Sequence, residues 1–234
     1  MRAVVLCLMA LLVAPIAGAV PTLSARRIER QDAQAVARAI QNHYRQAGTL
    51  QAVFLETYRA GNSNLQVESG KVYFRRPGQM RWDYESPQKK LFLVDGHYAW
   101  FYIPADHTVS RTPVRKSDDW RTPFSLLTGK ARLSDLCRQV SIVPNQGGPS
   151  APPAGHVVLD CTPKHKGTFL DAQIEVDRHD RIVGVLVKQP GEVSTEVRFG
   201  NWRENIPLPK SLFHFQVPPG VAVVNNQAIA GSAE

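Results

Sequence analysis

Hydrophobic and polar residues alternate over much of the chain with a period of two, which is typical of strands whose two faces have different surroundings. The clearest example follows Pro77, where Met80, Trp82 and Tyr84 fall on one face and polar residues on the other. Such a face needs an apolar cover. The cover is either the protein's own core or a ligand.

The same period predicts a series of short strands. They are expected at 50–58, 66–74, 79–84, 90–94, 97–103, 108–114, 156–161, 169–176, 182–188, 192–199 and 212–216. Asp95-Gly96 is a strong hairpin signal, and most connections are too short for a helical crossover. We therefore expect an antiparallel meander, closed into a barrel or half-barrel so that few edges stay exposed.

Helical spacing is found at few places. Residues 32–47 carry one narrow apolar stripe, after a polar and basic segment at 20–30 that is expected to be loose. The stripe consists of Ala33, Val36, Ala37, Ile40 and Tyr44. Two short helices are expected at 122–127, with Thr122 as N-cap, and at 133–137. They are too short to be stable alone and must dock on the sheet.

The first 19 residues have the features of a secretion signal. Arg2 precedes an apolar run from Val4 to Val13, and Ala17-Gly18-Ala19 fits a cleavage site. No later segment approaches the roughly 18 apolar residues of a membrane span. We expect residues 20–234 to form a single exported, soluble domain.

The formal net charge of +8 falls by one unit when Arg2 is removed. A basic exported protein can meet anionic lipid head groups or acidic partner surfaces, or the charge can serve solubility alone. Nucleic acid is excluded as a partner by the expected compartment and by the absence of a nucleic-acid-binding motif.

Two cysteines remain after the signal, Cys137 and Cys161. In an oxidising compartment they are expected to form one disulfide, which would stabilise the fold by about 3 kcal/mol; the alternative is two buried thiols. Between them lies a segment rich in proline and glycine, 145–155, which is expected to be a flexible surface loop.

Signatures of catalysis are absent from the sequence. Gly129-Lys130 lacks the upstream glycine of a phosphate loop, and no serine lies in a nucleophile elbow. Asp177, His179 and Asp180 are too few for a metal site and are better explained as a solvated turn. We expect no enzyme activity, no metal and no cofactor.

What remains is binding. Large aromatic residues recur at alternating strand positions, and a sheet face of this kind has more apolar surface than one helix can fill. They are Phe54, Trp82, Tyr84, Trp100 and Tyr102. The unfilled part is a candidate cavity for acyl chains, with the helix at 124–127 as a movable cover; the alternative is an ordinary packed core.

Five segments, in order along the chain, resemble the LolA family of periplasmic carriers, which ferry lipoproteins from the inner to the outer membrane. They are Leu50-Gln-Ala-Val-Phe54; Arg76-Pro77 with Met80 and Trp82; Leu93-Val-Asp-Gly96 with Trp100-Phe-Tyr102 and Pro104; Thr122-Pro-Phe124 with Leu126-Leu127; and Phe213-His-Phe215 with Pro219-Gly-Val221. The cysteine pair, the loop at 145–155 and the positive charge depart from a minimal member of the family.

The resemblance implies an incomplete antiparallel β-barrel of about 11 strands wrapped round a long helix, with short lid helices. It implies that Arg76 hydrogen-bonds the lid in the closed state, although the neighbouring Arg75 could share or replace that role. The expected lid-closing residues are Arg76, Phe124, Leu126 and Leu127. The expected cavity lining is Leu50, Phe54, Met80, Trp82, Tyr84, Leu93, Trp100 and Tyr102.

The implied function is that of a periplasmic, monomeric carrier. Its partners would be acylated lipoproteins as cargo, the inner-membrane lipoprotein-releasing ABC transporter and an outer-membrane acceptor. One alternative is a sensor of the same fold that binds mislocalised lipid or lipoprotein and regulates an envelope stress pathway, which a second downstream domain would favour. Another is a lipid hydrolase, which needs a nucleophile beside a base in the cavity.

Overall fold

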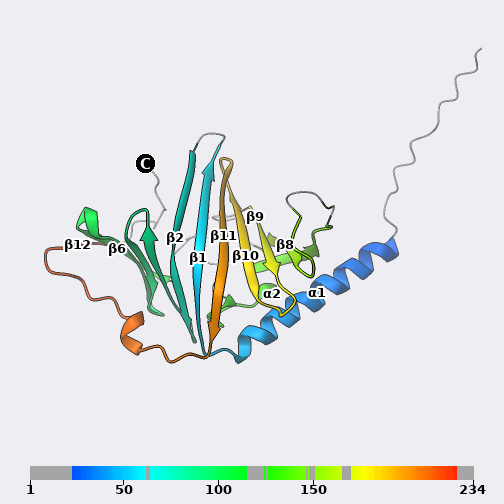
Figure 1. Ribbon diagram of the computed structural model, residues 1–234, viewed down its shortest axis with the longest axis horizontal. Coiled ribbons are helices and arrows are strands. Elements are labelled where there is room, and N and C mark those ends of the chain that lie inside the picture. The colour runs from blue at the N-terminus through cyan, green and yellow to red at the C-terminus, as the bar shows by residue number, and fades with distance from the viewer. Residues whose placement is uncertain are drawn as a thin grey trace, which may run out of the picture.

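The computed structural model describes residues 23–61, 64–114, 124, 126–145, 147, 151–164 and 170–225. The expected signal at 1–19, the expected N-cap Thr122 and part of the loop at 145–155 lie outside these residues. The described chain is mainly β, with few helices (Figure 1).

The strands form one twelve-stranded sheet in the order β12-β6-β5-β4-β3-β2-β1-β11-β10-β9-β8-β7. Their bounds are β1 (Thr49–Ala60), β2 (Asn64–Arg75), β3 (Gln79–Ser86), β4 (Lys90–Val94), β5 (Tyr98–Ile103), β6 (Thr108–Pro113), β7 (Cys137–Ile142), β8 (Val157–Pro163), β9 (Asp171–Val176), β10 (Ile182–Gln189), β11 (Val193–Glu204) and β12 (Ala222–Asn225). The sheet is open, with β12 and β7 as its edges, so the expected closure does not occur. Neighbours are antiparallel except for β12, which pairs with β6 in parallel.

Helices are few in the described part of the chain. They include α1 (Leu23–Gln46), α2 (Leu133–Leu136) and the 3-10 helices η1 (Pro104–Asp106) and η4 (Lys210–Phe213). α1 starts nine residues before the expected residue 32, because the basic segment ahead of the stripe is rich in arginine, glutamate, glutamine and alanine, which favour a helix. The expectation of a loose start at 20–30 was therefore wrong for the residues from Leu23 onward.

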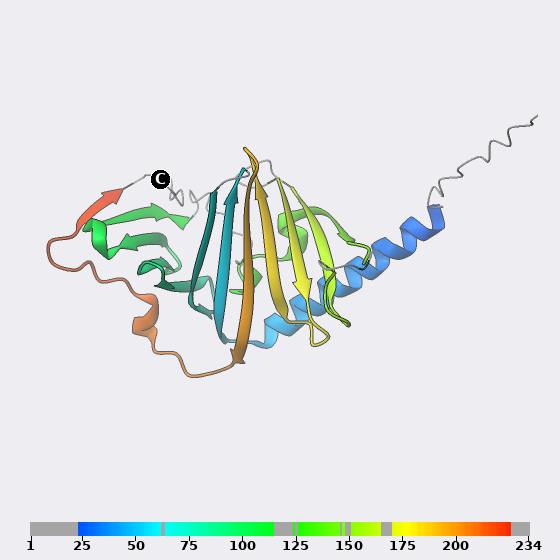
Figure 2. The same cartoon turned by 45° about the horizontal axis from the view of Figure 1, so that its top comes forward.

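The apolar stripe of α1 is buried against the sheet. Ala33, Ile40 and Tyr44 are each at most 1% exposed, and the Tyr44 hydroxyl accepts a hydrogen bond of 2.8 Å from the backbone N–H of Ile182 in β10. α1 packs chiefly on β7, so it lies on the half of the sheet that ends with that strand (Figures 1 and 2).

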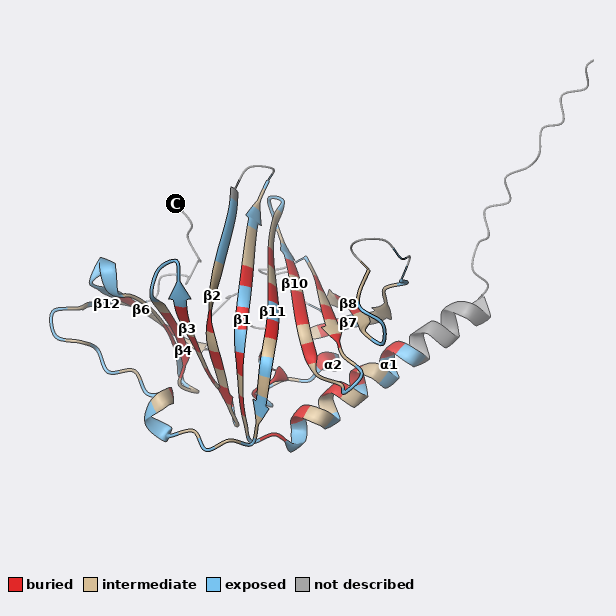
Figure 3. Cartoon of the chain, in the orientation of Figure 1, coloured by how far each residue is buried: buried red, intermediate tan, exposed pale blue. Residues whose placement is uncertain are grey.

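Apolar side chains cover both faces of the sheet. The face that α1 contacts, here the inner face, carries the main core, which we call the inner cluster. On the opposite, outer face a smaller outer cluster contains Leu91, Leu93, Trp100 and Val109, with Tyr102, Phe215 and Val221 packed against it. Figure 3 shows the result along β1, where buried and exposed residues alternate.

The outer cluster is covered by the chain after β11. Residues 205–221, here called the strap, leave β11, pass through η4 and reach β12 (Figure 2). The strand expected at 212–216 was wrong. In this segment the Leu212 carbonyl accepts a hydrogen bond of 3.1 Å from the Arg81 guanidinium. Phe213 is buried at the end of η4, and Phe215 packs on the outer cluster from the loop that follows, so their alternation does not come from a strand.

Two strands had no counterpart in the sequence prediction. β7 follows α2 directly, at the point where the pattern predicted that a helix continues through Cys137. β12 pairs with β6 in a register that places Ala222 opposite Thr108. This contact joins distant parts of the chain, so no local turn pattern predicts it.

Candidate functional site

Aromatic side chains fill the centre of the inner face. The rings of Phe54 and Trp82 lie 4.9 Å apart, centroid to centroid. The Phe124 ring inserts next to them, 5.1 Å from Trp82 and 5.6 Å from Phe199. Phe124 is 2% exposed. The space that an apolar ligand would need on this face is thus occupied by a side chain from the segment that follows β6.

Phe124 belongs to what we call the lid segment, whose described residues are Phe124 and 126–130. Leu126 and Leu127 are 4% and 0% exposed and join the inner cluster. Its backbone is tightly turned, since the N–H groups of Leu127 and Gly129 donate to the carbonyls of Phe124 and Leu126. The sequence predicted a short helical stretch here from its cap residues and its apolar residues, and it predicted that the stretch docks because it is too short to be stable alone.

The turn after β2 holds the lid segment. The Gly78 N–H donates a hydrogen bond of 3.1 Å to the carbonyl of Thr128. The Arg76 guanidinium lies directly over Gly129, so closely that a Cβ on Gly129 would be 2.4 Å from Arg76 Nη1. Gly129 also has a φ of +70°, a conformation that favours glycine.

Arg76 occupies this position at an energetic cost. Its Nε is buried and has no hydrogen-bond partner among the described residues. Burial, and secondarily the charge of Arg45, lower the pKa of Arg76. The expected hydrogen bond from Arg76 to the lid stays a prediction; among the described residues, the guanidinium packs on Gly129. The three atoms nearest to a Cβ at Gly129 all belong to Arg76.

The eight residues predicted to line one cavity lie on two faces. Five belong to the inner cluster: Leu50, Phe54, Met80, Trp82 and Tyr84. Leu93, Trp100 and Tyr102 lie on the outer face, so their prediction as part of the same lining was wrong.

The reason is the parity of the strand pairing. Trp82 in β3 is opposite Phe92 in β4, so Phe92 shares its face, and Leu93 must point the other way. Leu93 is in turn opposite Trp100. Because β4 is buried on both faces, its sequence is a continuous apolar run that hides this parity.

A buried carboxylate at one end of the inner face was missed by sequence reasoning. Glu56 follows Phe54 on the inner side of β1, is 6% exposed and accepts a hydrogen bond of 2.7 Å from the Tyr84 hydroxyl. Nearby, Lys90 and Glu68 form an ion pair of 2.5 Å. The apolar surface therefore ends in a polar row, which only the pairing of β1, β2, β3 and β4 could reveal.

A disulfide joins Cys137 to Cys161, the pair that the sequence predicts. It links the edge strand β7 to β8, with 5.4 Å between the two Cα atoms. Both cysteines are nearly buried in the inner cluster, so the bond fixes the edge of the sheet on which α1 packs.

The carboxylate of Asp177 serves the turn between β9 and β10. It accepts hydrogen bonds from the backbone N–H groups of His179 and Arg181. Within the described ranges, no group of three or more His, Cys, Asp or Glu side chains is placed to hold a metal ion.

Among the described helices, none combines the length and apolar character that crossing a bilayer requires.

Comparison with known proteins extends over most of the chain. A family model of the outer membrane lipoprotein carrier protein LolA matches residues 45–216. An outer-membrane lipoprotein carrier protein of Azotobacter vinelandii is 30% identical over 210 residues, which cover 86% of this chain and 95% of the relative. One from Nitrosospira multiformis is 29% identical over 185 residues, covering 76% and 83%.

A solved structure of an uncharacterized conserved protein from Thermus thermophilus is similar to this fold. The TM-score is 0.52 at 12% identity, and the match covers 84% of this chain and 100% of that one. At this identity the likeness supports the fold alone.

Proposed function

Since the chain belongs to the LolA family of outer membrane lipoprotein carrier proteins, we propose that it is a periplasmic carrier. In this role it binds the acyl chains of lipoproteins released from the inner membrane and delivers them to the outer membrane. The named relatives are carriers, which does not favour the sensor alternative.

The observation that carries the proposal is the position of Phe124 between Trp82 and Phe199. An acyl chain entering the inner face would take the place of this ring and of Leu126 and Leu127. Each buried methylene stabilises the complex by about 0.8 kcal/mol, but the displaced lid loses similar burial. Because an acyl chain replaces apolar lid side chains on the inner face, the net free energy of binding is small. The acceptor can therefore take the cargo from the carrier.

The lid segment is suited to such an exchange. A closed lid keeps the Nε of Arg76 buried with no hydrogen-bond partner from the described part of the chain, and it leaves two positive charges, Arg45 and Arg76, near each other. Opening would relieve both costs, offsetting part of the lost apolar burial. A difference of only a few kcal/mol between the states lets a ligand shift their populations.

In this proposal the open sheet and α1 act together as an incomplete barrel whose remaining opening is covered by the lid segment. The protein is exported by the signal at its N-terminus and works as a soluble monomer. It accepts cargo from an inner-membrane ABC transporter and passes it to an outer-membrane acceptor. The chemistry is non-enzymatic, since transfer requires only differential burial.

Substitution of Arg76 by leucine tests the lid mechanism. Arg76→Leu removes the buried cation and its packing on Gly129, so it is expected to change the ratio of open to closed lid. Each change of about 1.4 kcal/mol in the free-energy difference between the two states alters this ratio roughly tenfold. The measurement is transfer of a radiolabelled lipoprotein from inner-membrane vesicles to the carrier and then to outer-membrane vesicles. We expect cargo to accumulate on the variant or never to load stably.

The matched control is Arg75→Leu, since the three atoms nearest to a Cβ at Gly129 all belong to the neighbouring Arg76. Normal two-step transfer by Arg76→Leu would remove Arg76 from the mechanism. Copurification of acylated lipoprotein with the wild-type protein tests the carrier role itself, and progressive loss of its acyl chains would point to a hydrolase instead.

A further inference from the structure

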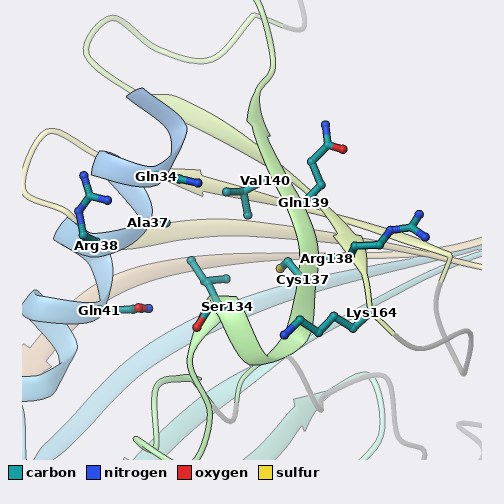
Figure 4. Close-up of a pocket in the computed structure, with 11 residues that line it drawn as sticks. Gln34, Ala37, Arg38, Gln41, Ser134, Cys137, Arg138, Gln139, Val140 and Lys164 are labelled. Carbon is teal, nitrogen blue, oxygen red and sulfur yellow. The ribbon is translucent and has the colours of Figure 1, made fainter. Parts of the chain in front are cut away.

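A second concave site lies away from the lid segment. A cavity of about 530 Å³ opens between α1 and the edge strand β7, with α2 on its border (Figure 4). This volume is within the range of about 300–1,000 Å³ typical of small-molecule sites.

The floor of this cavity is apolar. Ala37 of α1, Leu133 of α2 and Cys137 of β7 line it, and all three belong to the inner cluster. Val140, which packs against that cluster, completes the floor. The disulfide from Cys137 fixes the strand that forms one wall, so the cavity is preformed.

The rim of the cavity is basic. Lys164 reaches toward the gap between α1 and β7, whereas the guanidinium groups of Arg38 on α1 and Arg138 on β7 lie to either side and extend away from it (Figure 4). None of the described residues that line it is acidic. The acid next to Ser134 on the border, Asp135, forms an ion pair of 3.1 Å with Arg132. Hydrogen bonds from Arg132, and less strongly the charges of Arg132 and Lys164, lower the pKa of Asp135.

These cations are available to a ligand. Arg38, Arg138 and Lys164 form no ion pair with a described residue. Gln34 and Gln41 extend from α1 toward β7 and add neutral hydrogen-bonding groups to the rim (Figure 4). Charge-assisted hydrogen bonds from arginine and lysine are the strong contacts that bind phosphate groups in proteins.

We propose that this cavity binds the phosphate-bearing head group of an anionic phospholipid. The phosphate lies at the basic rim, and the first methylenes of the acyl chains lie on the apolar floor. A free phosphate would use only the rim, and a zwitterionic lipid would bring its own cation against Arg38 and Lys164. The inference concerns a site apart from the lid segment and does not rest on the proposed carrier function.

The test is calorimetric titration of the purified, oxidised protein with a short-chain, soluble lipid. Dihexanoylphosphatidylglycerol is expected to bind, at least tenfold more tightly than dihexanoylphosphatidylcholine, and more weakly as salt is raised, because salt screens the rim charges. Inorganic phosphate and glycerol 3-phosphate serve as head-group probes and are expected to bind at least tenfold more weakly than the lipid.

Two variants separate charge from shape. Arg38→Gln combined with Lys164→Gln removes two rim cations and is expected to lower the affinity for phosphatidylglycerol at least tenfold. Gln34→Trp keeps every charge but places a bulky ring at the rim of the cavity, and it is expected to cause a similar loss. Arg59→Gln removes an exposed cation on β1, outside the cavity lining, and is expected to leave binding unchanged.

Circular dichroism and thermal unfolding establish that each variant is folded. Equal binding of the zwitterionic lipid would overturn the role of the rim charges, and equal binding of inorganic phosphate would overturn the role of the floor. Unchanged phosphatidylglycerol affinity in both cavity variants would overturn the site.

Discussion

Glu175, on the outer side of β9, is a carboxylate whose neighbours determine its charge state. His156 Nδ1 lies 2.7 Å from its Oε1, and the Arg198 guanidinium donates to its Oε2. Burial by itself would raise the pKa of Glu175, but the hydrogen bonds from His156 and Arg198 outweigh it, and the pKa is lowered. The ionised form is therefore favoured in the folded protein.

This shift predicts a pH dependence of stability. A carboxylate with a lowered folded pKa stabilises the fold above its unfolded pKa of about 4.3, and this contribution is lost as the pH falls through the folded pKa. Glu175→Gln is expected to cost about 1 kcal/mol at pH 7 and to reduce the loss of stability below pH 4. Urea unfolding at several pH values measures both effects.

Glu85→Gln is the matched control, since Glu85 pairs with Lys71 at an exposed position. Screening by water is expected to keep its effect below about 0.5 kcal/mol. The same change in the pH profile for both variants would contradict the assignment to Glu175.

At the scale of elements, β7 depends on long-range connections. It is an edge strand that pairs only with β8 among the described strands, and the disulfide and α1 hold it in place. β7 also forms one wall of the cavity between α1 and this edge of the sheet. Loss of the disulfide would thus loosen both the sheet and the site proposed there.

Replacement of both cysteines measures this contribution. Cys137→Ser with Cys161→Ser opens a loop with a sequence separation of 24, so unfolding is expected to become easier by about 3 kcal/mol in the chain-entropy model. Denaturant unfolding gives the value, and wild-type protein under reducing conditions should behave like the double variant. A difference below about 0.5 kcal/mol would show that the remaining contacts of β7 suffice.

At the scale of the whole molecule, the strap 205–221 joins the middle of the sheet to one of its edges. It starts at β11 in the middle of the strand order and delivers the chain to β12 at the edge. On the way, the Phe215 ring packs 5.4 Å from Trp100 and 5.5 Å from Tyr102. The outer cluster is therefore a second, smaller core that only the end of the described chain completes.

Phe215→Ala tests this second core. Because Phe215 is partly exposed, the loss is expected to be about 2 kcal/mol, below the range for a fully buried phenylalanine. Val217→Ala, at a position 39% exposed, is expected to cost less than about 0.5 kcal/mol. Unfolding and binding of a hydrophobic dye measure the two; equal effects would contradict the packing role of Phe215.

Local features of this protein follow from its sequence alone. The strand at 90–94 coincides with β4, the hairpin at Asp95-Gly96 joins β4 to β5, and the short apolar stretch at 124–127 is buried at its described residues. These features depend on a period of two, on turn residues and on apolar content, all of which act between neighbours in the chain. The family could be inferred for the same reason, from short segments in order.

The face that each side chain takes was set instead by tertiary pairing. Leu93 and Trp100 face outward because pairing with β3 sets the parity of β4 and β5, and that parity cannot be derived from a strand apolar on both sides. The parallel pairing of β12, the position of Arg76 over Gly129 and the basic rim between α1 and β7 likewise join residues far apart in sequence. Such contacts arise from burial and hydrogen bonding between distant segments, which leave no local pattern.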